Sequence, residues 1–434
     1  MGQALFPNSP VTLSYTDDGQ AKLGNHLIKN LVDRFDTPLY LIDYDTLKIN
    51  CESYTKTLEK FYPNSHVYYA AKANINVGLL DVISEFGLGA DVVSLGELHT
   101  ALQSKLSPQK ILLHGNNKSD EEIQLALSKD ICIVIDNEDD LDQILRFADP
   151  NKKNNVLLRF TPDIRAETHQ HIITGHADSK FGMNKASCLK IISKILQTDH
   201  IFCLGLHCHI GSQILQIEPY LQLIETVTEF SLEIKQQTGF IATHLNIGGG
   251  LGIAYKQQDQ GINIAQSIEQ IAKHLIKTFS KHQLTLPKLL LEPGRSIIGN
   301  AGCTVYTVGR TKQCQDVLFA FVDGGMADNP RPILYDAPHH FCLASKAKSS
   351  QQSIYDIAGK FCESGDILGK KIKLPTLHRG DLLMVLGTGA YNYAMSSNYN
   401  RARKPSMLLV KKDTYQELVT RQSLSDLILN DRRA

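Results

Sequence analysis

Short apolar runs alternate with longer polar or amphipathic stretches between Pro38 and Ser296. Short runs of this kind are typical of buried strands, and the stretches between them are typical of crossover helices. The alternation predicts parallel strands joined by helices. The nine candidate strands are Leu39–Asp43, Val67–Ala71, Ala90–Val93, Ile111–His114, Ile131–Asp136, Val156–Phe160, Ile201–His209, His244–Ile247 and Leu289–Glu292.

A closed (β/α)₈ barrel needs eight strands, one fewer than the candidates. Counted back from the last run, the eight begin just before Lys72, which leaves Leu39–Asp43 as a lead-in or cover strand. The sequence does not settle which of the nine lies outside. The active site of such a barrel forms at the C-terminal ends of its strands. A polar residue or glycine stands at each predicted end: Lys72, Asp91, His114, Asp136, Arg159, His209, Gly248 and Glu292.

The pattern changes after Ser296 to short strand-like pieces broken by Gly, Pro and Asn, with little helical periodicity. Examples are Cys303–Val308, Val317–Val322 and Leu382–Leu386. Short strand-like pieces with little helical periodicity predict a second, mostly β domain. The closing segment 414–430 is compatible with a short helix, or with a strand followed by a disordered end.

Composition narrows the function classes. Lys plus Arg and Asp plus Glu are both 45, so no basic surplus indicates nucleic-acid binding, and a small neutral or zwitterionic substrate fits better. The nine cysteines form no C-x-x-C pair and no zinc spacing, so no metal is expected, and their odd number argues against a disulfide framework. No signal-like or membrane-spanning stretch is visible. We therefore expect a cytoplasmic protein with no membrane partner.

Two local features suggest chemistry. Lys72 follows directly on the apolar and aromatic run from Val67, and a desolvated lysine amine is the form that condenses with a carbonyl to give a Schiff base. Gly248, Gly249 and Gly250 follow another strand, where backbone N–H groups can approach a phosphate closely. The simpler interpretations are a lysine that caps its strand and a tight turn.

Five further motifs accompany Lys72 in a fixed order. They are Gly89-Ala-Asp-Val-Val-Ser94, Gly205-Leu-His-Cys-His-Ile-Gly-Ser-Gln213, Asn246-Ile-Gly-Gly-Gly-Leu-Gly252, Glu292-Pro-Gly-Arg295 and Cys362-Glu-Ser-Gly-Asp366. Together they resemble the fold-type III pyridoxal-phosphate-dependent decarboxylases, most closely the diaminopimelate decarboxylase family, over about residues 37 to 410. The resemblance implies an alanine racemase-like TIM barrel over 37–286 and a β domain formed by 1–36 plus 287–434, with Val11–Tyr15 pairing into it.

The resemblance also assigns cofactor residues. Lys72 would carry pyridoxal 5'-phosphate, Glu292 would keep its ring nitrogen protonated, and His209 would stack on the ring. His207 would contribute packing or hydrogen bonding, while Glu97 and Arg159 would line the site or be structural. The remaining cofactor contacts would come from Asp91, Ser212, Gly248, Gly249, Gly250, Gly294, Arg295 and Tyr391.

Substrate residues follow from the same likeness. Cys362, or a group that it orders, would donate a proton at the substrate α-carbon, and Glu363 would face the distal amino group, both supplied by the other subunit of a homodimer. A distal carboxylate would be bound by Arg295, Arg331 and Tyr335, because arginine pairs bidentately with carboxylates. Tyr391 would also contact the substrate. The chain departs from the family where Gly359-Lys360-Phe361 replaces the usual Gly-Pro, and His176 is unusual in the loop 174–182.

The implied reaction is decarboxylation of meso-2,6-diaminopimelate at its D-centre to L-lysine and CO₂, the last step of lysine biosynthesis. The alternatives are arginine, ornithine or carboxynorspermidine decarboxylases of the same fold, and a non-catalytic cofactor-binding regulator. Glu363 and Arg331 argue against the first group, because the ornithine and arginine enzymes carry aspartate at the position of Glu363. The presence of Lys72 and Cys362 argues against the regulator.

Overall fold

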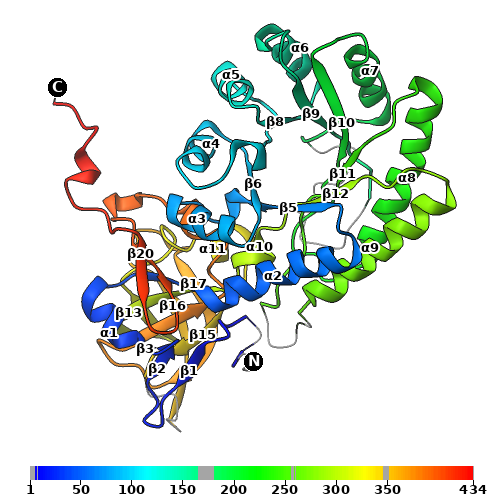
Figure 1. The fold of residues 1–434 in the computed structure, drawn as a ribbon. Helices are drawn as coiled ribbons and strands as arrows, with labels where there is room; N and C mark the ends of the chain where they lie inside the picture. The colour runs from blue at the N-terminus through cyan, green and yellow to red at the C-terminus, as the bar shows by residue number, and fades with distance from the viewer. Residues whose placement is uncertain are drawn as a thin grey trace. The chain divides into compact units, whose positions relative to one another are not determined.

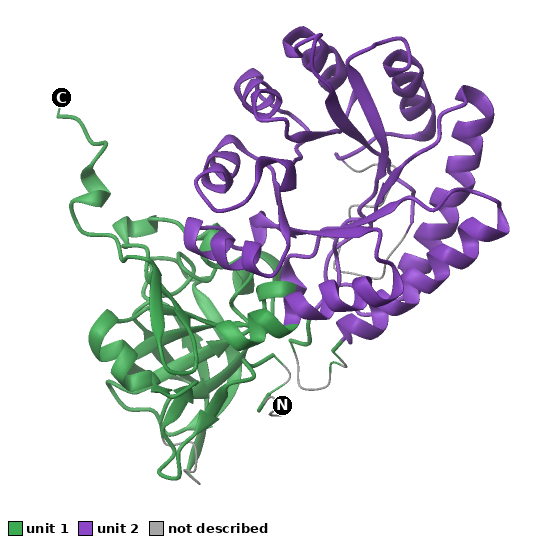
Figure 2. Ribbon diagram, in the orientation of Figure 1, with its two compact units in different colours: residues 1–49, 253–261, 297–434 green, residues 50–252, 262–296 purple. Residues whose placement is uncertain are grey.

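The computed structural model describes residues 5–6, 8–164, 180–255, 259, 261–345 and 351–433. The chain forms two compact units, coloured separately in Figure 2. The first unit comprises residues 1–49, 253–261 and 297–434, and the second comprises 50–252 and 262–296. We call them the β unit and the barrel unit.

The barrel unit is a closed barrel of eight parallel strands in the order β10-β11-β12-β5-β6-β7-β8-β9 (Figure 1). Its first strand is the one that precedes Lys72, so the predicted (β/α)₈ count is confirmed. The strands are β5 (Ser65–Ala70), β6 (Gly89–Val92), β7 (Ile111–Leu113), β8 (Cys132–Ile135), β9 (Asn154–Arg159), β10 (Ile201–His207), β11 (His244–Asn246) and β12 (Lys288–Leu291).

Helices connect consecutive barrel strands, and short polar side chains define where most of them begin. The helices are α3 (Val77–Glu85), α4 (Leu95–Leu102), α5 (Asp120–Ser128), α6 (Glu138–Phe147), α7 (Lys185–Ile195), α8 (Glu218–Thr238) and α9 (Ile264–Lys281). Ser119 and Glu122 form a reciprocal capping box at α5, and Asn137 accepts an amide hydrogen bond at the start of α6. These caps fix the positions at which each strand-end loop must turn.

The barrel interior is filled by large apolar side chains. Tyr68, Leu112, Val134, Leu157 and Leu290 form one buried cluster, each from a different strand. Such layers make a barrel a packed core and not a pore. Polar chemistry is therefore confined to the strand ends.

The β unit contains a nine-stranded sheet, and its main path runs β17-β16-β14-β13-β4-β19-β20, with β18 joining β13 to β15. Its strands are β4 (Leu39–Asp43), β13 (Gly302–Cys314), β14 (Val317–Val322), β15 (His340–Leu343), β16 (Gln352–Ala358), β17 (Ile367–Pro375), β18 (Leu382–Leu386), β19 (Ser406–Val410) and β20 (Tyr415–Val419). A small sheet of β1 (Leu13–Tyr15), β2 (Ala21–Leu23) and β3 (His26–Leu27) belongs to the same unit. The predicted mostly β domain is confirmed.

The remaining helices are α1 (Ile28–Phe35), α2 (Tyr44–Phe61), α10 (Arg295–Ile298) and α11 (Arg331–Tyr335). Short 3-10 turns follow β5 at Ala71–Ala73 and lie near the C-terminus at Asp426–Ile428. The closing segment thus contains a strand, β20, and then this single turn. No helix in the described residues is long and apolar enough to cross a membrane.

The structure places the strand that the sequence left open, and its compact units divide at other residues than the predicted domains. The ninth candidate strand, Leu39–Asp43, is β4, which lies in the β sheet between β13 and β19. The predicted domain boundaries stood at 36/37 and 286/287, whereas the compact units divide at 49/50 and 296/297. The second difference arises because β12 pairs with β5 and β11 inside the barrel. An apolar run reveals a strand but not its partners, which are distant in sequence.

Candidate active site

The predicted strand-end residues lie at the C-terminal ends of the barrel strands. Lys72 is in the 3-10 turn after β5, and its side chain is exposed while Ala71 and Ala73 on either side are buried. His114 and Glu292 each come directly after a strand, and both are buried. The structure therefore places these residues at the strand ends, as the ends of the apolar runs predicted.

Glu292 is the centre of a buried hydrogen-bond network. Its carboxylate accepts from Asn246 Nδ2 at 2.6 Å and contacts the Nε2 atoms of His114 and His207 at 2.8 and 2.9 Å. Burial alone would raise the pKa of Glu292, but the two histidines outweigh burial and hold it well below its ordinary value. Burial also lowers the pKa of His207 to about 4, so this imidazole is neutral at pH 7 and donates through Nε2–H. The result is an ionised carboxylate inside the barrel.

His207 was expected to contribute packing or hydrogen bonding, and the hydrogen bond to Glu292 confirms this. The trio of His114, His207 and Glu292 offers three ligand atoms within 4.8 Å of one another, a spacing compatible with a cation. The contacts to Glu292 have hydrogen-bond lengths, and its ionisation follows from them. We therefore describe this trio as a carboxylate with its donors.

Two more carboxyl groups lie close enough to Lys72 to be affected by its charge. Burial raises the pKa of Asp91, while His114 and Lys72 act in the opposite direction. Burial likewise raises the pKa of Glu97 to about 7, although its carboxylate accepts the Val93 N–H at 2.8 Å. A carboxyl group that titrates near neutral pH can exchange protons during a reaction.

The glycine run after β11 packs closely against neighbouring backbone. A Cβ on Gly249 would lie 2.0 Å from the carbonyl oxygen of Glu292, and Gly250 has a φ of +114° that other residues rarely adopt. A Cβ on Gly248 would lie 2.9 Å from Nδ1 of His209, so this imidazole lies against the run. Burial and the charge of Lys72 hold the pKa of His209 well below its ordinary value, which leaves it neutral.

The motif Glu292-Pro-Gly-Arg295 brings further predicted residues to the same region. The Arg295 guanidinium is buried and donates from Nη2 to Ser212 Oγ at 3.0 Å. A Cβ on Gly294 would approach the side chains of Ala70 and Ala73 to 3.1 Å. Arg295 and Ser212 were predicted from separate motifs, and they are in direct contact.

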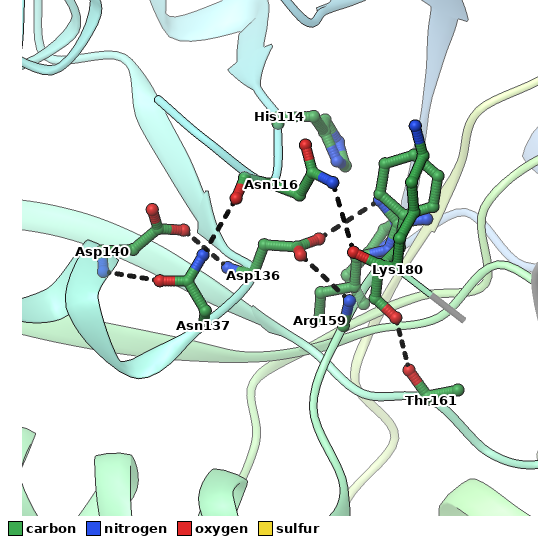
Figure 3. A network of polar contacts seen from close by, with 12 residues as sticks. His114, Asn116, Asp136, Asn137, Asp140, Arg159, Thr161 and Lys180 are labelled. Atoms are coloured by element: carbon green, nitrogen blue, oxygen red, sulfur yellow. Dashed lines mark hydrogen bonds and ion pairs between the residues drawn. The ribbon is translucent and has the colours of Figure 1, made fainter. Parts of the chain in front are cut away.

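A second polar network surrounds Asp136 at the end of β8 (Figure 3). Its carboxylate lies 3.4 Å from Arg159 Nη1 and accepts the Gly182 N–H at 3.0 Å. The Asp136 N–H donates to Asp140, which also forms a buried ion pair with Lys118 at 2.6 Å. These contacts fix Arg159 at the end of β9. Most of the predicted loop 174–182, including His176, lies outside the described residues.

The β unit builds a separate cationic site around Arg331. This residue begins α11 and is 8% exposed. Its guanidinium carbon lies 5.5 to 5.8 Å from the ring centroids of Tyr255, Tyr335 and Tyr391. Aromatic rings at such distances orient and stabilise a guanidinium. Tyr391 has a φ of +62°, an uncommon conformation that tends to cluster at functional sites.

Cys362 and Glu363 lie in the turn between β16 and β17 of the β unit. Cys362 is exposed, and its N–H donates to Asn400 Oδ1 at 3.0 Å. Glu363 is also exposed and accepts a hydrogen bond from the hydroxyl group of Tyr399. The structure thus divides the predicted site residues between the two units. The supply of this pair to a second subunit stays a prediction.

Several residues of these networks were missed by sequence reasoning. Asn246 opens the glycine motif, so its place at a strand end could have identified it as a partner of Glu292. Lys118 and Asp140 had no comparable signal, because their pairing joins a loop to a helix. Tyr255 also had none, since only the fold brings it to Arg331.

A (β/α)₈ barrel with a lysine, an ionised glutamate and a close-packed glycine run at its strand ends, joined to a β unit, defines the fold-type III class of barrel enzymes. The model of the pyridoxal-binding domain of the pyridoxal-dependent decarboxylases matches residues 48–299. The chain belongs to the diaminopimelate decarboxylase family of these decarboxylases.

Individual relatives agree along the whole chain. Diaminopimelate decarboxylases from Synechocystis and Staphylococcus aureus are each 37% identical, covering 97% and 98% of this chain and 92% and 100% of their own lengths. A crystal structure of diaminopimelate decarboxylase from M. jannaschii is similar, with a TM-score of 0.90, 31% identity and coverage of 98% of both chains. A second structure of that protein is a complex with L-lysine.

Pyridoxal phosphate is the cofactor of this family, and the residues present fit it. The glycine run leaves no room for side chains where a phosphate would need close backbone approach. Glu292 is ionised, as a partner of a protonated ring nitrogen must be. Lys72 presents an exposed amine at the same strand ends.

Proposed function

We propose that this enzyme removes CO₂ from the D-centre of meso-2,6-diaminopimelate and releases L-lysine, the last step of lysine biosynthesis. The observation that carries the choice of substrate is the buried Arg331 guanidinium among three tyrosines. A buried cation of this kind suits a substrate with a second carboxylate. Ornithine, arginine and lysine have no such group.

The barrel unit would hold the cofactor. Lys72 would bind it covalently, Glu292 would keep its ring nitrogen protonated, and His209 would lie against the ring. The phosphate side would be contacted by Gly248, Gly249, Gly250, Gly294, Arg295 and Ser212. Asp91 and Tyr391 would be further cofactor contacts. When bound, pyridoxal phosphate accepts the electron pair of the bond that breaks as CO₂ leaves.

The remaining residues would bind the substrate and move a proton. Arg331, Tyr335, Tyr391 and Arg295 would hold the distal carboxylate, and the Glu363 carboxylate would pair with the distal ammonium group. The Cys362 thiol would deliver a proton to the α-carbon that loses CO₂. Its exposure leaves the sulfur accessible for that transfer.

We propose further that Cys362 and Glu363 complete the site of a second copy in a homodimer. Both side chains are exposed on a turn of the β unit, which suits residues supplied to another chain. A cytoplasmic location is supported by the nine free cysteines, because a reducing compartment keeps thiols unpaired.

Direct product analysis tests the reaction. Purified protein with added pyridoxal phosphate is incubated with meso-diaminopimelate, and L-lysine and CO₂ are quantified. LL-diaminopimelate, ornithine, arginine and carboxynorspermidine serve as competing substrates in parallel reactions. We expect turnover of the meso isomer alone. Comparable turnover of ornithine or arginine would replace this proposal with a polyamine-pathway decarboxylase, and cofactor binding without any turnover would favour a regulator.

Mixing two inactive variants tests the shared site. Lys72→Ala and Cys362→Ala proteins are combined under conditions in which mass spectrometry confirms subunit exchange. Hybrid dimers should regain one complete site and therefore activity. A mixture that exchanges subunits yet stays as inactive as both parents contradicts the shared site, while leaving the reaction itself in place.

A further inference from the structure

The turn that carries Cys362 and Glu363 is fixed by a carboxylate that follows it. Asp366 is 2% exposed and lies just before β17. Its Oδ2 accepts the Phe361 N–H at 2.9 Å, directly beside Cys362. Its own N–H donates to the Glu363 carbonyl at 3.1 Å, and its carbonyl accepts the Gly359 N–H at 2.9 Å. Asp366 therefore closes the turn from both sides.

The same carboxylate also binds a second segment. Its other oxygen, Oδ1, accepts the Met326 N–H at 2.7 Å. A Cβ on Gly325 would lie 2.5 Å from this carboxylate, and one on Gly359 would lie 2.1 Å from it. Both segments thus approach Asp366 at positions where only glycine fits without a shift. One side chain joins the turn 359–366 to the loop that begins at Gly324.

That loop leads directly to Arg331. The N–H groups of Asp328 and Asn329 donate to the Gly325 carbonyl at 3.1 and 2.8 Å, which makes a compact turn. The helix α11 then begins with Arg331. The position of Met326 is therefore coupled through this short segment to the start of the helix that carries the guanidinium.

A backbone hydrogen bond strengthens the same junction. The Lys360 N–H donates to the Gly324 carbonyl at 2.9 Å. Two hydrogen bonds therefore join the two segments, one from the Met326 N–H to the Asp366 carboxylate and one from the Lys360 N–H to the Gly324 carbonyl.

We propose that Asp366 is a positioning residue that holds the Cys362–Glu363 turn and the 324–331 loop in one fixed arrangement, and so sets the thiol and the distal-group residues for the substrate. The catalytic part of this inference rests on the proposed function. Its structural part does not, because the hydrogen bonds exist in the chain itself. Asp366 itself makes no contact with the reacting atoms in this scheme.

Two variants disturb the junction in different ways. Asp366→Asn keeps the shape but replaces one acceptor oxygen by a donor, so one of the two N–H groups loses its partner. Gly359→Ala keeps the carboxylate but places a methyl group where it lies. Because Gly359 does not have a positive φ, alanine there tests space and not backbone strain.

Asp356→Asn is the matched control. Asp356 lies in β16, on the same β16–β17 hairpin, and its carboxylate accepts the Lys371 N–H at 2.8 Å. The chemical change is identical and the hairpin is the same, but the contact is away from the Cys362 turn. Any general effect of weakening this hairpin should therefore appear in the control as well.

Hydrogen exchange and thiol labelling give readouts that do not depend on turnover. In Asp366→Asn and Gly359→Ala, the Met326 and Phe361 amides should exchange faster while the Lys371 amide stays as in the wild type. In Asp356→Asn all three amides should exchange as in the wild type, because the remaining amide oxygen can still accept the single Lys371 N–H. The alkylation rate of Cys362, followed by mass spectrometry, should change at least about threefold in the first two variants, because local opening alters access to the thiol.

Turnover gives the functional readout. The value of kcat for meso-diaminopimelate should fall about 10- to 100-fold in Asp366→Asn and Gly359→Ala, the scale of a displaced reacting group. Cofactor absorbance should stay unchanged in both variants, and the control should keep kcat within about twofold. Active wild-type protein together with unchanged kcat and unchanged Cys362 labelling in Asp366→Asn or Gly359→Ala would overturn the inference. Inactive wild-type protein would contradict the proposed function. The exchange rates of the Met326 and Phe361 amides would then still test whether Asp366 holds the two segments together.

Discussion

The two units bury carboxyl groups to the same depth but shift their pKa values in opposite directions. Glu292 in the barrel unit is 6% exposed and Asp328 in the β unit is 5% exposed. The pKa of Glu292 is held well below its ordinary value, whereas burial raises the pKa of Asp328 from 3.8 to about 7. Depth of burial therefore does not decide the charge of a carboxylate.

The difference comes from the partners. Glu292 is surrounded by three nitrogen-bearing side chains. Asp328 has the phenol of Tyr306 and the Gly325 N–H, and the carboxylates of Asp323 and Asp366 oppose its ionisation. The barrel unit thus keeps the Glu292 carboxylate ionised, which suits a cationic ring, while the β unit disfavours ionisation of Asp328. In this division of roles, the barrel unit performs the chemistry, and the β unit selects the substrate and supports the site. The four predictions below test this division.

The largest effect should come from Lys72→Ala in the barrel. We expect turnover to fall about 10³-fold or more, because the residue that would hold the cofactor covalently is lost. Wild-type protein reduced with borohydride should carry the cofactor on Lys72, as located by mass spectrometry. Lys72→Arg, which keeps the positive charge, should be equally inactive. An adduct on a different lysine would reject the assignment.

Arg331→Ala in the β unit should cost about 2 to 5 kcal/mol in kcat/KM for meso-diaminopimelate, the range for removing one partner of a desolvated charge pair. The cofactor absorbance should remain that of the wild type, because Arg331 would bind substrate only. Lysine release and the absorbance spectrum are measured on the same samples. Loss of the cofactor band in this variant would break the proposed division of roles.

Glu292→Gln removes the barrel charge while preserving the shape of the side chain. We expect kcat to fall about 10²-fold, the scale for loss of one preorganised electrostatic group. The amide also cannot accept from all three of its donors, so the barrel should lose some stability. Steady-state kinetics with saturating cofactor check the first expectation, and thermal unfolding checks the second. Normal turnover would show that the charge is not required.

Asp328→Asn should change stability and its pH dependence more than turnover. A carboxyl group whose pKa is raised from 3.8 to about 7 on folding contributes stability that is complete below about pH 4 and lost as the pH rises to about 7. The variant should therefore lose this pH dependence, which amounts to at most about 4 kcal/mol. Glu292 has the opposite sign, since its contribution is present above about pH 4.5 and is lost on acidification. Urea unfolding at pH 5 and pH 8 measures the difference; an unchanged pH slope in Asp328→Asn would contradict it.

The barrel half of the molecule was largely predictable. Strand ends are local features, so the residues at or just beyond the apolar runs, such as Glu292 and His114, were placed correctly. The hydrogen-bond and ion-pair partners in the barrel were harder to predict from the sequence. Asn246 was missed although it ends a strand, and the pairing of Lys118 with Asp140 needs the folded loop.

The β unit was predictable in class but not in detail. Strands such as Leu382–Leu386 matched their apolar runs, whereas β4 was left unassigned because its partners lie far away in sequence. Cys362 and Glu363 could be identified only by resemblance, since turns carry no periodicity. Asp366 closes that motif, yet its link to Met326 depends on the packing of distant segments.

The position of β4 bears on how the chain matures during synthesis. Ile42 pairs with Gly302 and Leu39 pairs with Ser406, and all five residues of β4 are buried in the finished sheet. Every barrel strand is translated before either partner exists. Domains generally fold as units, and the N-terminal parts leave the ribosome first. The barrel can therefore close during synthesis, before the partner strands of β4 are available. Until residues 302–314 and 406–410 have been synthesised, β4 therefore has neither of the partner strands with which it pairs in the finished sheet.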